Sequence, residues 1–319
     1  MNALRPSRAR NFRVMFQGPR TSHLPLANFR SPSGARLESC IFSQFNSLEG
    51  EPLELKQQKE KVFHDKAFSE GTRDRAVKFY TTVSKSRDFY DEFLRDHCLS
   101  KDVLEYGCGP GYEALFIAKS AFSVTGIDIS DTAIEQANEM ARREQIENAT
   151  FRTMDAEAMD FNDESFDLIC GMGILHHLDL DKSLREIART LRPGGKAIFI
   201  EPLGHNPIIN LYRKITPDLR TEDEHPLLTK DLKLMKSYFN RIEPHYFHFH
   251  SILAAPFRKL PGYRLLLKTF DTVDRALFKL LPFTKKYAWQ VVVVLSQPVV
   301  AATHTNALQT AGLVETVGQ

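Results

Sequence analysis

The amino-acid sequence predicts a doubly wound α/β fold, in which a mostly parallel seven-stranded sheet carries helices on both faces. From about residue 100, short β-branched or aromatic runs alternate with amphipathic stretches, which is the pattern of parallel strands joined by helices. A glycine-rich loop, "GCGPGY", directly follows the first of these runs. Near the other end, "VVVVL" at 291–295 is apolar enough to lie in the middle of a sheet.

Seven runs are predicted to be strands, because each combines β-branched or aromatic residues with neighbouring turn residues. In chain order they are "DVLEYG" (102–107), "SVTGIDI" (123–129), "ATFRTMDA" (149–156), "FDLICGMG" (166–173), "KAIFIEP" (196–202), "PHYFHFH" (244–250) and "YAWQVVVVLS" (287–296).

Helical periodicity separates these strands. The predicted helices lie at 112–120, 130–145, 181–191 and 228–239, with two more expected within 71–97. Ser130 is expected to cap the second of these helices. The apolar residues of that helix share one face: Ala133, Ile134, Ala137 and Met140. The helix at 181–191 is expected to stop at "RPGG".

Changes in composition predict the domain boundaries. Residues 1–52 are expected to be a disordered or targeting extension, and residues 53–99 to form N-terminal helices. The α/β domain is expected at 100–297. Residues 298–319 are polar and small without periodicity, which predicts a flexible tail.

The formal net charge is +2, but the basic residues are unevenly distributed. Residues 1–37 hold seven arginines and no acidic residue, which leaves 35 Lys and Arg (42 − 7) against 40 Asp and Glu elsewhere. The body of the chain is therefore mildly acidic, and no basic cluster in it predicts nucleic-acid binding. An Arg-rich segment without acids is typical of an organelle transit peptide, although a disordered extension has the same composition.

Cysteine usage and hydropathy indicate the compartment. Cys40, Cys98, Cys108 and Cys170 show no CxxC spacing, which favours a reducing environment. No apolar stretch approaches the roughly 20 residues that a membrane-spanning helix needs. We therefore expect a cytoplasmic protein, or an organelle-matrix protein if residues 1–37 are a transit peptide.

The glycine-rich loop predicts a ligand site at the end of the first strand. Gly107, Gly109 and Gly111 follow a GxGxG spacing, and the next helix begins with free N–H groups that suit a polar or anionic group. The loop is no P-loop, because no GK[ST] follows it. Tyr112 stands where the dinucleotide GxGxxG pattern has its last glycine, which makes a nicotinamide site less favoured.

Acidic residues lie within or near the ends of the first three predicted strands. Asp128 lies 21 positions after Gly107 (128 − 107), where a carboxylate accepts both ribose hydroxyls of a nucleoside; a helix-entry role is the alternative. Asp155 is placed to meet an adenine edge beside Ala156, or to form a plain turn. Glu105 interrupts an apolar strand, so it is expected to have a partner among the N–H groups and hydroxyls of the loop.

Five ordered motifs carry a resemblance to a known family. "VLEYGCGPG", "VTGIDIS", "MDAEAMDF", "FDLICGMGILHHL" and "LRPGGKAIFIEP" resemble the successive motifs of class I S-adenosylmethionine-dependent methyltransferases, which have a Rossmann-like fold. The similarity is greatest to the small-molecule branch that includes ubiquinone and menaquinone methyltransferases. It covers about residues 100–202 well, and its motifs are specific for the cofactor rather than for the substrate.

The resemblance implies S-adenosyl-L-methionine as cofactor and a role for each motif. The backbone of Gly107, Gly109 and Gly111 would line the methionine part, Glu105 would hold that end, and Asp128 would bind the ribose. The residues implied at the adenine or the sulfonium are Ile129, Asp155, Ala156, Gly171 and Met172. No metal is implied.

Methyl transfer from a sulfonium requires proximity, orientation and, for a hydroxyl or acidic carbon, a base. His176 and His177 follow the fourth strand, and either one is a candidate base, with bracing of the loop as the alternative. Glu201 and His205, after the fifth strand, are second candidates for contact with the acceptor; a structural salt bridge is the alternative for Glu201.

Two stretches interrupt the alternation and are expected to be helical insertions near the acceptor side, at 203–226 and 251–287. Arg213 and Arg220 in the first are candidates to meet an acidic acceptor. In the second, apolar residues at helical spacing predict a face that packs on the sheet: Leu266, Phe270, Val273, Leu277 and Leu280. The same composition suits a lipophilic acceptor channel or shallow membrane contact.

The sequence therefore predicts an enzyme that methylates oxygen or carbon of a small, lipophilic acceptor. Two alternatives stay open. One is a cofactor-binding partner or assembly protein without catalytic activity, and the other is a nicotinamide-dependent oxidoreductase, which Tyr112 and the later motifs disfavour.

Overall fold

The computed structural model describes residues 55–69, 84–216 and 224–299. The predicted N-terminal extension lies outside these residues. So do the first of the two helices expected within 71–97 and nearly all of the predicted tail. Within the described part, no helix is long and apolar enough to cross a membrane.

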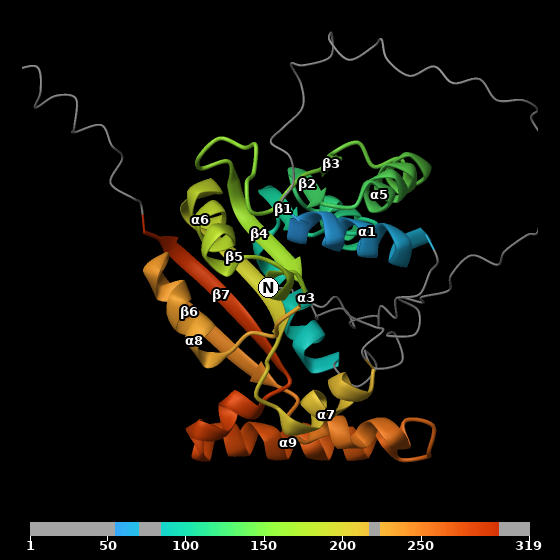
Figure 1. Ribbon diagram of the computed structural model, residues 1–319, viewed down its shortest axis with the longest axis vertical. Helices are drawn as coiled ribbons and strands as arrows, with labels where there is room; N and C mark the ends of the chain where they lie inside the picture. Colours follow the sequence, from blue (N-terminus) through green and yellow to red (C-terminus); the bar gives the residue numbers. More distant parts are fainter. Residues whose placement is uncertain (1–54, 70–83, 217–223, 300–319) are drawn as a thin grey trace, which may run out of the picture. The chain divides into compact units, whose positions relative to one another are not determined.

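The described strands form one seven-stranded sheet in the order β3-β2-β1-β4-β5-β7-β6 (Figure 1). Strands β1 to β5 pair in parallel, whereas β7 pairs antiparallel with both β5 and β6. The strands are β1 (Asp102–Tyr106), β2 (Ser123–Asp128), β3 (Ala149–Thr153), β4 (Phe166–Met172), β5 (Leu191–Pro202), β6 (Phe239–Phe247) and β7 (Gln290–Pro298). The predicted mostly parallel α/β sheet is confirmed.

Each face of the sheet packs against its own set of helices. In β1, Leu104 faces one hydrophobic core and Val103 the other, because successive side chains of a strand point to opposite faces. Helices α3, α4 and α5 supply residues to the core around Val103, and α6 and α9 to the core around Leu104. The helices are α1 (Leu55–Ser69), α3 (Ser84–His97), α4 (Tyr112–Ala118), α5 (Asp131–Glu144), α6 (Leu180–Thr190), α7 (Pro207–Ile215), α8 (Thr229–Leu234) and α9 (Tyr263–Leu280).

Short 3₁₀ turns complete the described elements. They are η2 (Leu175–His177), η4 (Met235–Ser237), η5 (Ser251–Phe257) and η6 (Pro282–Tyr287).

Helix α5 follows the prediction closely. The Ser130 hydroxyl accepts a hydrogen bond from the N–H of Ala133, which is the expected N-cap. Ile134 and Ala137 are buried against the sheet, as the apolar spacing indicates.

Three local predictions differ from the structure. Helix α6 ends at Thr190, close to the predicted stop, but β5 begins already at Leu191 and contains "RPGG", whereas the predicted strand begins at Lys196. Strand β6 begins at Phe239, five residues before the predicted start (244 − 239), because it pairs with β7 along its whole length. The helical prediction in 251–287 holds for α9, but its apolar face is only partly buried: Leu266, Phe270 and Leu277 are half-buried, whereas Leu280 is exposed. Asp271 and Asp274 are buried instead.

Candidate functional site

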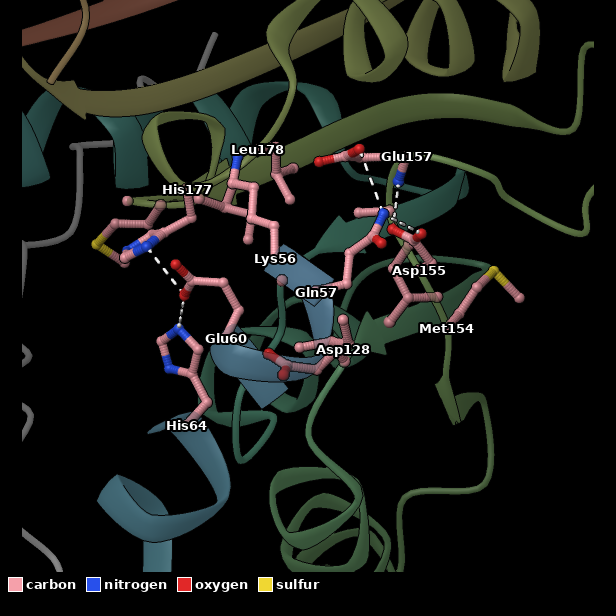
Figure 2. Close-up of a pocket in the computed structure, with 17 residues that line it drawn as sticks. Lys56, Gln57, Glu60, His64, Asp128, Met154, Asp155, Glu157, His177 and Leu178 are labelled. Atoms are coloured by element: carbon pink, nitrogen blue, oxygen red, sulfur yellow. Dashed lines mark hydrogen bonds and ion pairs between the residues drawn. The ribbon is translucent and has the colours of Figure 1, made fainter. Parts of the chain in front are cut away.

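A pocket lies at the carboxyl ends of the parallel strands (Figure 2). Gly107 after β1, Asp128 at the end of β2, Asp155 after β3 and Met172 at the end of β4 line it, and α1 closes it from one side. Open parallel sheets bind ligands at this edge, where the strand order reverses. The space measures about 710 Å³, including the part that opens to solvent.

The backbone conformation of the glycine-rich loop requires glycine at three positions. Gly107, Gly109 and Gly111 have φ angles of 73°, 50° and 78°, in the left-handed region that favours glycine. A Cβ at Gly107 would lie 2.7 Å from the side chain of Ile174, so a larger residue would push apart the floor of the pocket. Of the three glycines, Gly107 lines the pocket.

The Asp128 carboxylate holds the loop at the end of β2. One oxygen accepts a hydrogen bond from the N–H of Gly109 at 2.8 Å, and the other accepts one from the N–H of Ser130 at 3.0 Å. The side chain thus serves the helix entry and also lines the pocket beside Ile129. Both interpretations of Asp128 are compatible with this geometry.

Asp155 and Ala156 lie in the turn after β3 and line the pocket. The Asp155 carboxylate accepts a hydrogen bond from the Gln57 side-chain amide at 2.9 Å and another from the N–H of Glu157 at 2.8 Å. The Ala156 carbonyl accepts a hydrogen bond from the Tyr106 hydroxyl, which fixes this turn to β1.

Glu105 is buried below the loop rather than in the pocket. Its carboxylate accepts a hydrogen bond from the N–H of Ala114 in the first turn of α4, at 2.8 Å. Burial, and next the neighbouring Glu113 carboxylate, raise the pKa of Glu105 well above its usual range. Arg87 of α3 pairs with Glu113 and lies near the Met172 sulfur, so it borders the same end of the site.

Gly171 is enclosed within the sheet, because a Cβ there would lie 2.8 Å from the Tyr106 carbonyl oxygen. It does not line the pocket, in contrast to its neighbour Met172.

His176 and Glu201 form a buried pair behind the pocket. The Nδ1 atom of His176 lies 2.7 Å from one Glu201 oxygen, and the other oxygen accepts the N–H groups of Ile174 and Leu175 at 3.0 and 2.9 Å. Burial lowers the pKa of His176, against the opposing effect of the Glu201 carboxylate. This pair braces the turn after β4.

His205 lies outside the pocket. Its Nε2 atom accepts a hydrogen bond from the N–H of Thr229 at 3.3 Å, at the start of α8. Arg213 of α7 lies 3.7 Å from Glu224, and Arg220 is outside the described residues.

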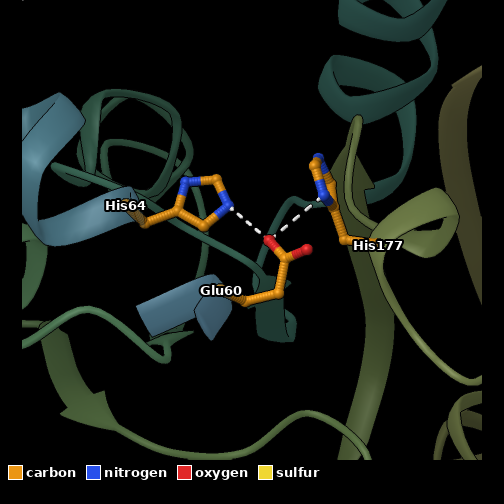
Figure 3. A group of neighbouring side chains, drawn as sticks. All are labelled: Glu60, His64 and His177. Atoms are coloured by element: carbon orange, nitrogen blue, oxygen red, sulfur yellow. Dashed lines mark ion pairs between the residues drawn. The ribbon is translucent and has the colours of Figure 1, made fainter. Parts of the chain in front are cut away.

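His177 is the predicted catalytic candidate that lines the pocket. Its Nδ1 atom lies 3.3 Å from an oxygen of Glu60, and the same oxygen lies 3.3 Å from Nε2 of His64 (Figure 3). All three side chains are largely buried.

The role of α1 in lining the pocket was not predicted from the sequence. Gln57, Glu60 and His64 share one face of this helix, since they are spaced by three and four residues, and that face covers the pocket. Polar contacts hold the helix in place: Lys61 donates to the Ile129 carbonyl at 3.0 Å, in addition to the pair of Gln57 with Asp155. The spacing of these polar residues on one helical face is the sequence feature that could have indicated their role in the pocket.

The chemistry of the lining suits S-adenosylmethionine. Asp128 and Asp155 offer carboxylate oxygens to hydroxyls or an amine, and Ile129 and Ala156 offer apolar surface to an adenine ring. The lining contains four carboxylates, including Glu60 and Glu157, and Lys56 as its cationic side chain, which favours a positively charged sulfonium.

Comparison with known proteins agrees with the motifs. Residues 103–195 match the family described as "Methyltransferase domain". Over 100 residues the chain is 33% identical to an uncharacterized methyltransferase of Bacillus subtilis, which covers 31% of this chain and 40% of that protein. It is 34% identical over 100 residues to the ubiquinone biosynthesis O-methyltransferase of Coxiella burnetii, covering 31% and 42%. The match therefore spans about two fifths of these relatives' length.

A solved structure with the same fold is the geranyl diphosphate C-methyltransferase of Streptomyces coelicolor A3(2). The similarity has a TM-score of 0.53 at 17% identity and covers 78% of this chain and 100% of that one. None of these comparisons supports the oxidoreductase or the non-catalytic alternative. The match thus places a methyltransferase domain at residues 103–195, and the motifs within it resemble those of class I S-adenosylmethionine-dependent methyltransferases.

Proposed function

We propose that this protein transfers a methyl group from S-adenosyl-L-methionine to oxygen or carbon of a small, lipophilic acceptor. The observation that carries the proposal is the pocket at the strand ends of the matched domain, where Asp128, Asp155 and Gly107 lie together. The bound donor would supply an activated methyl group, so the protein has to bind, orient and shield the reactants.

In this proposal, the donor lies across the ends of β1, β2 and β3. Asp128 binds the ribose hydroxyls, and Asp155 meets the adenine edge. Ile129 and Ala156 pack on the ring, and Met172 lies at the sulfonium. Glu105, Gly109, Gly111 and Gly171 do not line the pocket, so they would support the loop and the sheet beneath the donor.

The acceptor end lies where α1 meets the turn after β4. His177 is the proposed base at this end, because it lines the pocket next to Glu60 and His64. His176 and Glu201 position that turn through their buried pair. His205 lies outside the pocket, so this proposal assigns it no role at the donor.

Replacing Asp128 by Ala tests the donor site. The variant should bind S-adenosylmethionine more weakly by about 1–3 kcal/mol in isothermal titration, since two hydroxyls lose a charged acceptor. Asp160→Ala is the matched control, because its side chain is 92% exposed and lies outside the pocket. Equal donor affinities for the two variants would remove Asp128 from the site.

Turnover is tested with a labelled methyl donor and a cell extract, followed by identification of the labelled product. An oxygen- or carbon-methylated lipophilic product is expected, with S-adenosylhomocysteine formed in equal amount. Donor binding without a labelled product would favour the non-catalytic alternative, and tighter binding of NADH than of the donor would favour the oxidoreductase.

A peripheral membrane surface on and around α9 suits a lipophilic acceptor. Leu265, Leu280 and Phe283 are 70%, 74% and 66% exposed, and the two acidic residues of this segment, Asp271 and Asp274, face inward. Exposed basic side chains surround these apolar residues: Arg258, Lys259, Arg264, Lys268, Arg275, Lys279 and Lys286. Apolar residues within a basic surface favour binding to anionic lipid.

Vesicles of phosphatidylcholine with or without phosphatidylglycerol test this surface. We expect sedimentation of the protein with the anionic vesicles, and at least a fivefold loss of binding for Leu265→Ser combined with Leu280→Ser. Phe122→Ser is the control, because Phe122 is 71% exposed but belongs to another surface. Equal binding of both variants would remove α9 from membrane contact.

We propose the cytoplasm as the location, with an organelle matrix as the alternative if residues 1–37 direct import. A fluorescent reporter fused to these residues distinguishes the two. Deleting them should leave donor affinity unchanged, since the segment has little apolar surface to bury.

A further inference from the structure

A compact group of metal-ligating side chains closes one end of the pocket (Figure 3). Glu60 and His64 come from one face of α1, four residues apart, and His177 comes from the turn after β4. One Glu60 oxygen lies 3.3 Å from Nε2 of His64 and 3.3 Å from Nδ1 of His177. One ligand atom from each residue lies within 4.8 Å of the other two.

The surroundings of this group favour a cation. The three side chains are 8%, 13% and 11% exposed, so they are largely shielded from bulk water. The pocket lining also contains Asp128, Asp155 and Glu157, with Lys56 as the opposing charge. An enclosed site with an excess of carboxylates attracts positive ions.

We propose that Glu60, His64 and His177 form a binding site for a divalent first-row transition metal ion such as Zn²⁺. Zinc ligands lie at about 2.0–2.1 Å from the ion, so tetrahedral ligand atoms are about 3.3–3.4 Å apart. The two distances from the Glu60 oxygen have this value. Two imidazoles and one carboxylate also occur in catalytic zinc sites that keep a fourth position open.

A neighbouring group, His176, His177 and Glu224, is less suited to a metal ion. Nδ1 of His176 already pairs with Glu201 at 2.7 Å. Glu224 lies 3.7 Å from Nε2 of His176 and 3.7 Å from the Arg213 guanidinium, which makes it part of a charge cluster. The Glu60 group is therefore the proposed site.

If the chain is the proposed methyltransferase, the open position selects an alcohol or phenol as acceptor. A hydroxyl bound to the ion loses its proton to solvent more readily, as metal-bound water does. Its oxygen then attacks the methyl carbon: the C–O bond forms, the S–CH₃ bond breaks, and the electron pair stays on sulfur as S-adenosylhomocysteine leaves. His177 serves as a ligand in this scheme, and the methylated atom is oxygen.

Cobalt titration of the full-length, chelator-treated protein tests the site. Co²⁺ bound to mixed nitrogen and oxygen ligands gives visible absorption bands, and Zn²⁺ should displace it. We expect at least tenfold weaker Co²⁺ binding in His64→Ala and in Glu60→Gln, which retains the size of the side chain. His97→Gln is the control, because His97 ends α3 outside the pocket.

Equal Co²⁺ affinity in the wild type, Glu60→Gln and His64→Ala, with circular dichroism confirming folding, would overturn the metal site. If His64→Ala does not fold, Glu60→Gln and His177→Ala decide. Binding of S-adenosylhomocysteine to the chelator-treated protein is measured in parallel. If the wild type binds S-adenosylhomocysteine but no Co²⁺, only the metal site is contradicted. If the wild type does not bind S-adenosylhomocysteine, the proposed function is contradicted.

Discussion

Helices α5 and α9 both carry an amphipathic pattern, but only α5 buries its apolar face as that pattern predicts. In α5, Ile134 and Ala137 are buried, as the spacing of the apolar residues predicts. In α9, the buried residues include Asp271 and Asp274, while Leu265 and Leu280 face outward. Periodicity thus predicts that a segment is helical, but it does not by itself predict which face is buried.

The difference comes from the partner of each helix. Helix α5 packs on β2 and β3, whose apolar residues need an apolar cover. Helix α9 meets the chain reversal after β6, where backbone N–H groups are without strand partners. Asp274 accepts hydrogen bonds from the N–H groups of Phe249, His250 and Ser251 at 2.9, 2.9 and 3.2 Å. A buried donor left unpaired is costly, so the carboxylate faces inward.

The largest expected effect is that of Asp274→Ala. Three backbone donors and the ring of His250 lose their acceptor, so the free energy of unfolding should fall by about 4 kcal/mol. Urea denaturation measures the change. Thr272→Ala is the matched control on the exposed side of the same helix and should change stability by less than about 0.5 kcal/mol. Similar losses for both variants would show that Asp274 is not the anchor of α9.

A pair of Ser substitutions compares the apolar residues of the two helices. Ile134→Ser in α5 should lower the free energy of unfolding by about 3 kcal/mol, because it buries a hydroxyl and opens a cavity. Leu280→Ser in α9 should change it by less than about 0.5 kcal/mol, because the side chain is 74% exposed. A loss above about 2 kcal/mol at Leu280 would mean that this face of α9 is covered in solution.

The smallest effect concerns the pH dependence of α9. Burial, and next the Asp274 carboxylate, raise the pKa of Asp271 to about 6, above its unfolded value of 3.8. The folded state therefore binds this proton more tightly, and its contribution to stability is lost as pH rises from about 4 through 6. Asp271→Asn should remove that loss and stabilise the protein at pH 7.5 by about 1 kcal/mol, after solvent screening is allowed for.

Urea denaturation of the wild type and Asp271→Asn between pH 4.5 and 7.5 tests this expectation. The two stability curves should diverge as pH rises. Parallel curves would assign the titration to another group.

The donor side of the site was largely predictable, whereas the acceptor side was not. Gly107, Asp128 and Asp155 follow consecutive strands, and the ends of parallel strands meet at one edge, so their order in the chain places them together. Glu60 and His64 lie on a helix whose pocket-facing side is polar. Apolar periodicity assigns such a side to solvent, so it could not indicate their contact with His177.

The sequence by itself determined the order of strands and helices, the glycine loop after the first strand, and the capping of α5, because each depends on residues close together in the chain. Only the tertiary structure decided that Glu201 pairs with His176 instead of facing an acceptor, and that α9 presents Leu265 and Leu280 outward. Both outcomes depend on buried polar groups that find their partners far away in sequence. Satisfying these groups takes precedence over burying a few more apolar side chains.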